Sequence, residues 1–252
     1  MSELAQRLAA AGFVAPDEEA AELIAAARGD DDQLEELVAR RLTGEPLAWI
    51  TGTVSFCGLT IGVSPGVYVP RWHSEALAEY AAAALPPGGV GIDVCTGSGA
   101  IAAVLGARRP EARVVATDID PNAVRCAGSN GVEAYAGDLF APAPQELRGR
   151  VDVVTGVVPY VPTAELTYLQ RDTFTFEGTL GYHGGEDGLE VFSECAREAR
   201  RWLKPDGTIG LEVGRGQEAT AAELFEQLGY TRTTVIRDDE GNVRGISARS
   251  VG

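Results

Sequence analysis

The chain has 252 residues and a formal net charge of −16, from 21 Lys and Arg against 37 Asp and Glu. A field of that sign repels phosphate backbones and anionic lipid surfaces, so it argues against a nucleic-acid or membrane partner and weakly favours small cations. Four scattered cysteines without a Cys-x-x-Cys pair argue against a disulfide framework and a zinc knuckle, and no metal site is expected. The chain start lacks a secretory signal pattern and no apolar run approaches membrane length, so a cytoplasmic location is expected.

The first part of the chain, residues 2–43, reads as three short helices. Ser2 is the expected N-cap of the first helix, and Asp17 opens the second, which Gly29 ends. Asp30 begins the run of acidic residues that precedes the third helix. Leucine and valine recur there at helical spacing, which predicts a small helical bundle.

Residues 49–69 follow a different pattern, because β-branched and aromatic residues alternate with glycine. This pattern is typical of a β-hairpin. We therefore expect an N-terminal helical domain with a hairpin linker over residues 1–68 and a larger domain over residues 69–252.

From Val90 onward, strand-like and helix-like runs alternate, which predicts βαβ units and a mostly parallel sheet. The strand-like runs are VGIDVC, ARVVATDI, EAYAGDL, VDVVTGV and TIGLEVG, with helices expected over residues 99–108, 121–130, 188–203 and 217–228. The final runs, TRTTVIRD and VRGISARS, read as an antiparallel hairpin with Gly241 and Asn242 in its turn. The expected class is a Rossmann-like α/β fold. Its C-terminal antiparallel hairpin differs from the end of the sheet in the usual dinucleotide dehydrogenase.

Three acidic residues mark a candidate cofactor site at the strand ends. IDVCTGSGAIA places Asp93 at a strand end, and Gly97 and Gly99 in the turn that opens a helix, where glycine allows close approach of a ligand and the helix adds amide donors. Asp118 ends the next strand about twenty residues further on, where an acid can accept both ribose hydroxyls. Asp138 ends a third strand, where it can accept an adenine amino group. The glycine pattern alone also suits NAD-binding proteins, but together the three acids favour a nucleoside cofactor.

Over nearly its whole length the chain resembles the HemK/PrmC-type glutamine-N5 methyltransferases, class I enzymes that use S-adenosylmethionine (SAM). VPRWHSE resembles the family's PRPxTE motif, DVCTGSGAIA its DLGTGTGAIA, and GVVPY stands where the family has NPPY. RRLTGEPLAWITGTVSFCGL, GGEDGLEVF and LKPDGTIGLEVG also look like family segments. The resemblance implies a Rossmann-like class I methyltransferase sheet with a C-terminal antiparallel hairpin, SAM as cofactor and S-adenosylhomocysteine (SAH) as product.

The resemblance also implies which residues hold SAM. The loop from Cys95 to Gly99 would line the methionine part, Asp118 would hold the ribose, and Asp138 and Leu139 would flank the adenine. Cys95 stands where the family usually has glycine. The full expected cofactor-binding set is Arg71, Glu75, Asp93, Cys95, Thr96, Gly97, Ser98, Gly99, Asp118, Ile119, Asp138, Leu139 and Gly156.

The chain departs from the family at the NPPY position. In the family the Asn of this box hydrogen-bonds the glutamine amide; here Val157 replaces it and Val158 replaces the first Pro, whereas Pro159 and Tyr160 match. A site that hydrogen-bonds an amide loses discrimination when the partner group is missing. A carbonyl cradle formed by Gly156 or Val158, the aromatic face of Tyr160 and an apolar wall remain, and these suit a planar cation such as a guanidinium.

A guanidinium must lose a proton to react, so a neighbouring carboxylate is expected to assist. Glu165, Glu177 and Glu186 follow in the chain, and the first two are the preferred catalytic candidates beside Val157, Val158, Pro159 and Tyr160. Further candidate walls are Tyr68, Trp72 and Phe174, while His73 and His183 are expected to be structural.

Three functions remain open on the sequence. The first is SAM-dependent N-methylation of a small cationic acceptor, with the guanidino group of free L-arginine in specialised metabolism, such as antibiotic biosynthesis, as the preferred example. The second is glutamine-N5 methylation of a protein such as a peptide-chain release factor, which the helical N-terminal segment favours because that segment binds the protein partner in the family. The third is a non-catalytic SAM- or dinucleotide-binding protein.

Overall fold

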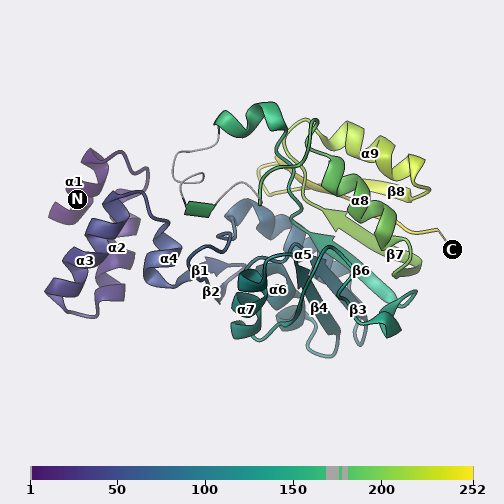
Figure 1. The fold of residues 1–252 in the computed structure, drawn as a ribbon, viewed down its shortest axis with the longest axis horizontal. Helices are drawn as coiled ribbons and strands as arrows, with labels where there is room; N and C mark the ends of the chain where they lie inside the picture. The colour runs from purple at the N-terminus through teal and green to yellow at the C-terminus, as the bar shows by residue number, and fades with distance from the viewer. Residues whose placement is uncertain (1, 169–175, 178–180, 252) are drawn as a thin grey trace.

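The computed structural model describes residues 2–168, 176–177 and 181–251 (Figure 1). Four helices begin the chain and lie at one end of the molecule, beside a two-stranded hairpin (Figure 1). Their bounds are α1 (Glu3–Ala10), α2 (Pro16–Ala27), α3 (Asp31–Leu42) and α4 (Leu47–Thr51), followed by β1 (Thr53–Phe56) and β2 (Leu59–Gly62). These helices share a small core of their own, made of Ala5, Leu8, Ala20, Leu23, Ala27, Leu37, Val38 and Ile50.

The expected starts of the first and third helices are confirmed. The Ser2 hydroxyl accepts the N–H of the third residue after it, and the Asp30 carboxylate does the same at α3. The second helix begins at Pro16 rather than behind an Asp17 cap, because proline suits the first turn, where its missing N–H would have no partner. The hairpin is shorter than predicted: residues 49–51 belong to α4, and pairing ends at Gly62.

The rest of the chain forms a seven-stranded sheet in the order β5–β4–β3–β6–β7–β9–β8. The strands are β3 (Val90–Val94), β4 (Arg113–Asp118), β5 (Glu133–Ala136), β6 (Val151–Gly156), β7 (Leu203–Leu211), β8 (Thr231–Arg237) and β9 (Val243–Arg249). The first five strands of the order are parallel, and β9 pairs antiparallel with both β7 and β8. The predicted Rossmann-like α/β sheet with a C-terminal antiparallel hairpin is therefore confirmed.

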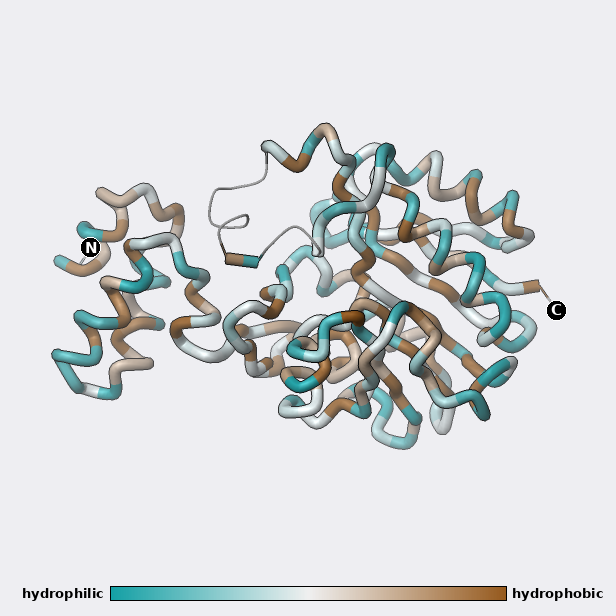
Figure 2. The backbone as a smooth tube through the Cα atoms, viewed as in Figure 1, coloured by the Kyte–Doolittle hydropathy of each residue, from teal (hydrophilic) through white to brown (hydrophobic). Residues whose placement is uncertain are grey.

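Helices cover both faces of this sheet. They are α5 (Glu75–Ala84), α6 (Ala100–Arg108), α7 (Pro121–Ser129), α8 (Glu190–Ala199) and α9 (Glu218–Gln227), with short 3-10 turns η1 (Trp72–Ser74), η2 (Gln145–Leu147) and η3 (Thr163–Tyr168). One buried cluster joins α5 and α6 to the sheet, and another joins α8 and α9 to its opposite face. Hydrophobic residues accordingly run along the central strands in Figure 2.

The helix and strand bounds agree with the predicted runs to within a few residues, except at two places. Helix α8 ends at Ala199, several residues before the predicted end at 203, and β7 already begins at Leu203. Among the described residues, no helix is both long and apolar enough to cross a membrane.

Candidate functional site

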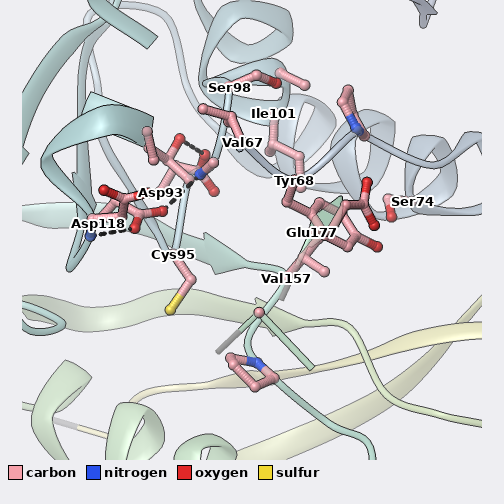
Figure 3. Close-up of a pocket in the computed structure, with 18 of the residues that line it drawn as sticks. Val67, Tyr68, Ser74, Asp93, Cys95, Ser98, Ile101, Asp118, Val157 and Glu177 are labelled. Atoms are coloured by element: carbon pink, nitrogen blue, oxygen red, sulfur yellow. Dashed lines mark hydrogen bonds between the residues drawn. The ribbon is translucent and has the colours of Figure 1, made fainter. Parts of the chain in front are cut away.

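One pocket opens where β3, β4 and β6 end, bounded on its other side by the segment that follows the hairpin (Figure 3). It encloses about 970 Å³ including its open mouth, a size typical of small-molecule sites. Asp93, Cys95 and Asp118 lie at one end, and Tyr68, Ser74 and Glu177 at the other, with Val157 nearby (Figure 3). The carboxyl edge of a parallel sheet is where α/β folds bind ligands.

Asp93 is deeply buried in the pocket wall, with 1% of its surface exposed. Thr96 donates its hydroxyl proton to Oδ2, whereas Oδ1 has no hydrogen-bond partner among the described residues. Burial raises the pKa of the Asp93 carboxyl to about 7, because a low-dielectric surrounding disfavours the charged form. A cationic ligand group that reaches Oδ1 would offset the free-energy cost of burying the charged carboxylate.

Asp118 ties the glycine turn to the end of β4. Its Oδ2 accepts the N–H of Gly97 at 2.8 Å, and its Oδ1 accepts the N–H of Asp120 at 2.9 Å. Gly99 is required at the helix start, because its φ is +80° and a Cβ there would lie 2.9 Å from the Cβ of Ala127. The turn is therefore held rigidly, with its backbone against the pocket.

Cys95 occupies a backbone conformation that favours glycine. Its φ is +53°, a left-handed value that costs an L-residue about 1–2 kcal/mol. Burial and the nearby Asp118, Asp93 and Asp138 raise the pKa of its thiol, so the sulfur stays protonated. The side chain lines the pocket without closing it.

Part of the expected cofactor set meets at this pocket. Its members in the lining are Asp93, Cys95, Thr96, Gly97, Ser98, Asp118 and Ile119. Asp138 is exposed and stands outside the lining, and the Leu139 side chain points into the core between the sheet and α8, which leaves only its backbone for an adenine contact. Their contact with the cofactor stays a prediction.

Three further expected residues have structural contacts outside the lining. Glu75 accepts the N–H of Cys57 at 2.8 Å and so fixes the turn of the β1–β2 hairpin. Gly156 brings β6 against β3, since a Cβ there would lie 2.6 Å from the carbonyl oxygen of Val94. Arg71 forms an ion pair with Glu177.

The segment from Val157 to Tyr160 follows β6 at the pocket edge, and its side chains lie alternately in the pocket lining and outside it. Val157 and Pro159 line the pocket, whereas Val158 is fully buried in the core on the α8 side. The ring of Tyr160 stands outside the lining, and its carbonyl accepts an N–H of Gln217 at 2.9 Å. Val157 of the predicted apolar wall therefore lies in the lining, whereas Tyr160, the predicted aromatic face, does not. Tyr68, one of the further candidate walls, does lie in the lining.

The two preferred carboxylates differ in their surroundings. Glu177 lines the pocket, but Arg71 and the hydroxyl of Tyr182 both donate to its Oε2, and the N–H of Val69 donates to its Oε1 at 3.1 Å. Glu165 is exposed on η3, outside the lining.

Of the remaining candidates, Trp72 is 65% exposed and packs against Arg244. Glu186 is exposed, and Phe174 lies outside the described residues.

The sequence interpretation missed Glu212. It follows β7 directly, is 2% exposed, and neither of its carboxylate oxygens has a hydrogen-bond partner among the described residues. His73, expected to be structural, brings its Nε2 to 3.4 Å from Oε1. An acid interrupting the apolar run TIGLEVG at a strand end was the available signal, the same one that marked Asp93 and Asp118.

Curated relatives were found along most of the chain. A release factor glutamine methyltransferase from Geobacter sulfurreducens is 34% identical over 234 residues, covering 90% of this chain and 79% of its own. One from Streptomyces coelicolor is 33% identical over 271 residues, covering 99% of this chain and 96% of its own. No family model matches the chain.

Solved structures support the fold. A methyltransferase from Pyrococcus furiosus gives a TM-score of 0.56 at 21% identity, covering 85% of this chain and 98% of its own. The 16S rRNA N2 G1207 methyltransferase of T. thermophilus, solved with AdoMet and guanosine, gives 0.54 at 19% identity, covering 79% of this chain and 44% of its own. With relatives above 30% identity along most of both chains, this chain belongs to the release factor glutamine methyltransferase family, and it is a methyltransferase that uses SAM as its cofactor.

Proposed function

We propose that this enzyme methylates the side-chain amide nitrogen of a glutamine residue in a protein acceptor. The observation that carries the proposal is the match to the Streptomyces relative along 99% of this chain, which includes the N-terminal helices. The first expectation from the sequence was a small cationic acceptor, with free L-arginine as its example. The relatives favour the second expectation, glutamine methylation of a protein. The non-catalytic alternative is set aside because both relatives are named as enzymes.

The surroundings of the two carboxylates expected to serve a guanidinium also favour the amide acceptor. The Glu177 charge is already matched by Arg71, so a second guanidinium there would compete with a buried ion pair. Glu165 is exposed and outside the pocket lining. Neither residue is arranged to accept a proton from a cationic substrate.

The pocket residues fit SAM chemically. When bound, SAM supplies a methyl group activated by a sulfonium. We infer that the unpartnered Oδ1 of Asp93 faces its ammonium group and that Asp118, whose oxygens keep further lone pairs, accepts the ribose hydroxyls. The turn carrying Gly97 contributes backbone close to the methionine part.

On the acceptor side, Val157 and Pro159 form an apolar wall that excludes water. The carbonyl of Gly156 already accepts the N–H of Glu212 at 3.2 Å, so the carbonyl of Val158 is the remaining proposed acceptor of the cradle. The protein's task is then to hold the acceptor nitrogen in line with the activated carbon, which is the dominant contribution in such transfers.

The test is incubation of the enzyme with SAM and four acceptors: an intact release factor, a Gly-Gly-Gln peptide, a matched Gly-Gly-Asn peptide and free L-arginine. We expect mass spectrometry to detect one added methyl on the glutamine of the first two and none on the others. Methylated arginine without methylated glutamine would contradict the proposal.

A further inference from the structure

Glu212 lies beside Val157 at the edge of the sheet. Gly156 of β6 pairs in register with Leu211 of β7, and the Glu212 N–H donates to the Gly156 carbonyl. Side chains at matched positions of neighbouring parallel strands share a face, so the residues that follow this pair also point to one side. A Cβ built at Gly210 on that side would lie 3.3 Å from the Leu77 side chain of α5, and Val157 packs against the same cluster as Leu77, so this is the face where Val157 lines the pocket.

Glu212 lies behind the pocket lining, with both carboxylate oxygens buried, and the groups around it connect it to the pocket wall. Burial, with the Glu212 carboxylate as a further cause, raises the pKa of both Tyr68 and Tyr160. Tyr68 lines the pocket on the same side as Val157 (Figure 3). Together with His73 from η1, these hydroxyls are the titratable groups that the described residues bring to Glu212. On the other side of β7, strand β9 places the apolar Ile246 opposite Leu211.

A buried carboxylate without hydrogen bonds is costly unless a donor reaches it in the working complex. Val157 is apolar and cannot orient an amide, so the pocket wall needs a polar group beside it. Glu177 is occupied by its own donors. Neither oxygen of Glu212 has a well-formed hydrogen bond among the described residues, and its polar neighbours are His73, whose Nε2 lies 3.4 Å from Oε1, and the Tyr160 hydroxyl.

We propose that Glu212 is a catalytic residue that accepts a hydrogen bond from the N–H of the acceptor amide next to Val157. The inference rests on the proposed function. As the new N–C bond forms and the methyl–sulfur bond of the sulfonium breaks, the nitrogen loses one proton to the Glu212 carboxylate, leaving SAH, the N-methylamide and a neutral Glu212. His73, with 27% of its side chain exposed, then carries that proton toward water.

The test separates binding from proton transfer with two substitutions. Glu212→Leu removes the acceptor oxygen and the base together, whereas Glu212→Gln keeps a carbonyl oxygen that can still accept a hydrogen bond but cannot take the proton. Glu223→Gln, on the exposed side of α9, removes the same charge far from the pocket and is the matched control. Thermal unfolding of every variant checks that the chain still folds.

Binding of the Gly-Gly-Gln peptide to the SAH-bound enzyme is measured by calorimetry, and methylation with SAM by mass spectrometry. We expect Glu212→Leu to weaken peptide binding at least about tenfold, as when a hydrogen bond to a charged group is lost. Glu212→Gln should bind the peptide nearly as the unmodified enzyme does and lower kcat at least about a hundredfold, the contribution of a positioned general base. Glu223→Gln should change neither.

Two results would overturn the assignment in distinguishable ways. If the unmodified enzyme methylates glutamine and folded Glu212→Leu and Glu212→Gln both retain its binding and kcat, Glu212 has no such role while the proposed function stands. If the unmodified enzyme neither binds nor methylates any glutamine acceptor, the proposed function fails and this inference fails with it.

Discussion

Replacing Asp93 with Asn should stabilise the cofactor-free protein and lower its affinity for SAM. The carboxyl has a pKa of about 7 in the folded chain against an ordinary value of 3.8. A group whose folded pKa is raised binds its proton more tightly in the native state, so its contribution to stability is fully present below pH 4. That contribution is lost as the pH rises toward 7. Asparagine resembles the protonated carboxyl and does not titrate.

The magnitude follows from the same two values. A pKa rise from 3.8 to about 7 corresponds to a free-energy penalty of about 4 kcal/mol for the ionised carboxylate above pH 7. At pH 5 the penalty is smaller, so the advantage of Asp93→Asn over the unmodified chain should grow by about 2–3 kcal/mol between pH 5 and pH 8. All other titrating groups are shared by the two proteins and cancel in the difference.

Urea unfolding of both proteins at several pH values, without cofactor, measures this difference. Calorimetry with SAM at pH 8 measures the second half of the prediction, in which the variant loses the carboxylate proposed to face the ammonium and binds at least about tenfold more weakly. A stability difference that does not change with pH, or a variant that binds SAM as well as the unmodified chain, would refute the reasoning.

Three further substitutions test single contacts. Cys95→Gly should be about 1 kcal/mol more stable than Cys95→Ala in thermal unfolding, because only glycine relieves the left-handed φ of +53°; equal stabilities would argue against strain there. Asn130→Ala should lower the free energy of unfolding by about 1–3 kcal/mol, since this amide bonds the backbone of Gly62 and Ser98 and so joins the hairpin to the cofactor loop; an unchanged urea midpoint would contradict it. Asp118→Ala should weaken SAM binding by about 1–3 kcal/mol in calorimetry, and an unchanged affinity would remove this residue from the site.

The sequence by itself determined the fold class and the strands whose ends carry the acidic residues of the pocket. The alternation of strand and helix runs predicts the α/β class, and glycines next to acidic strand ends predict where the pocket lies. Asp93, Gly97 and Asp118 meet there because the carboxyl ends of parallel strands necessarily share one edge of the sheet.

Only the tertiary structure decided which carboxylate has a partner. Glu177 looked available in the sequence, but the fold brings Arg71 to it from more than a hundred positions away. Glu212 looked like part of a strand, yet the register of β6 and β7 sets it beside Val157, with the His73 Nε2 3.4 Å from its Oε1. Long-range pairing is a property of the packed chain, and no local pattern encodes it, so the position of Glu212 beside Val157 follows only from the pairing of the strands.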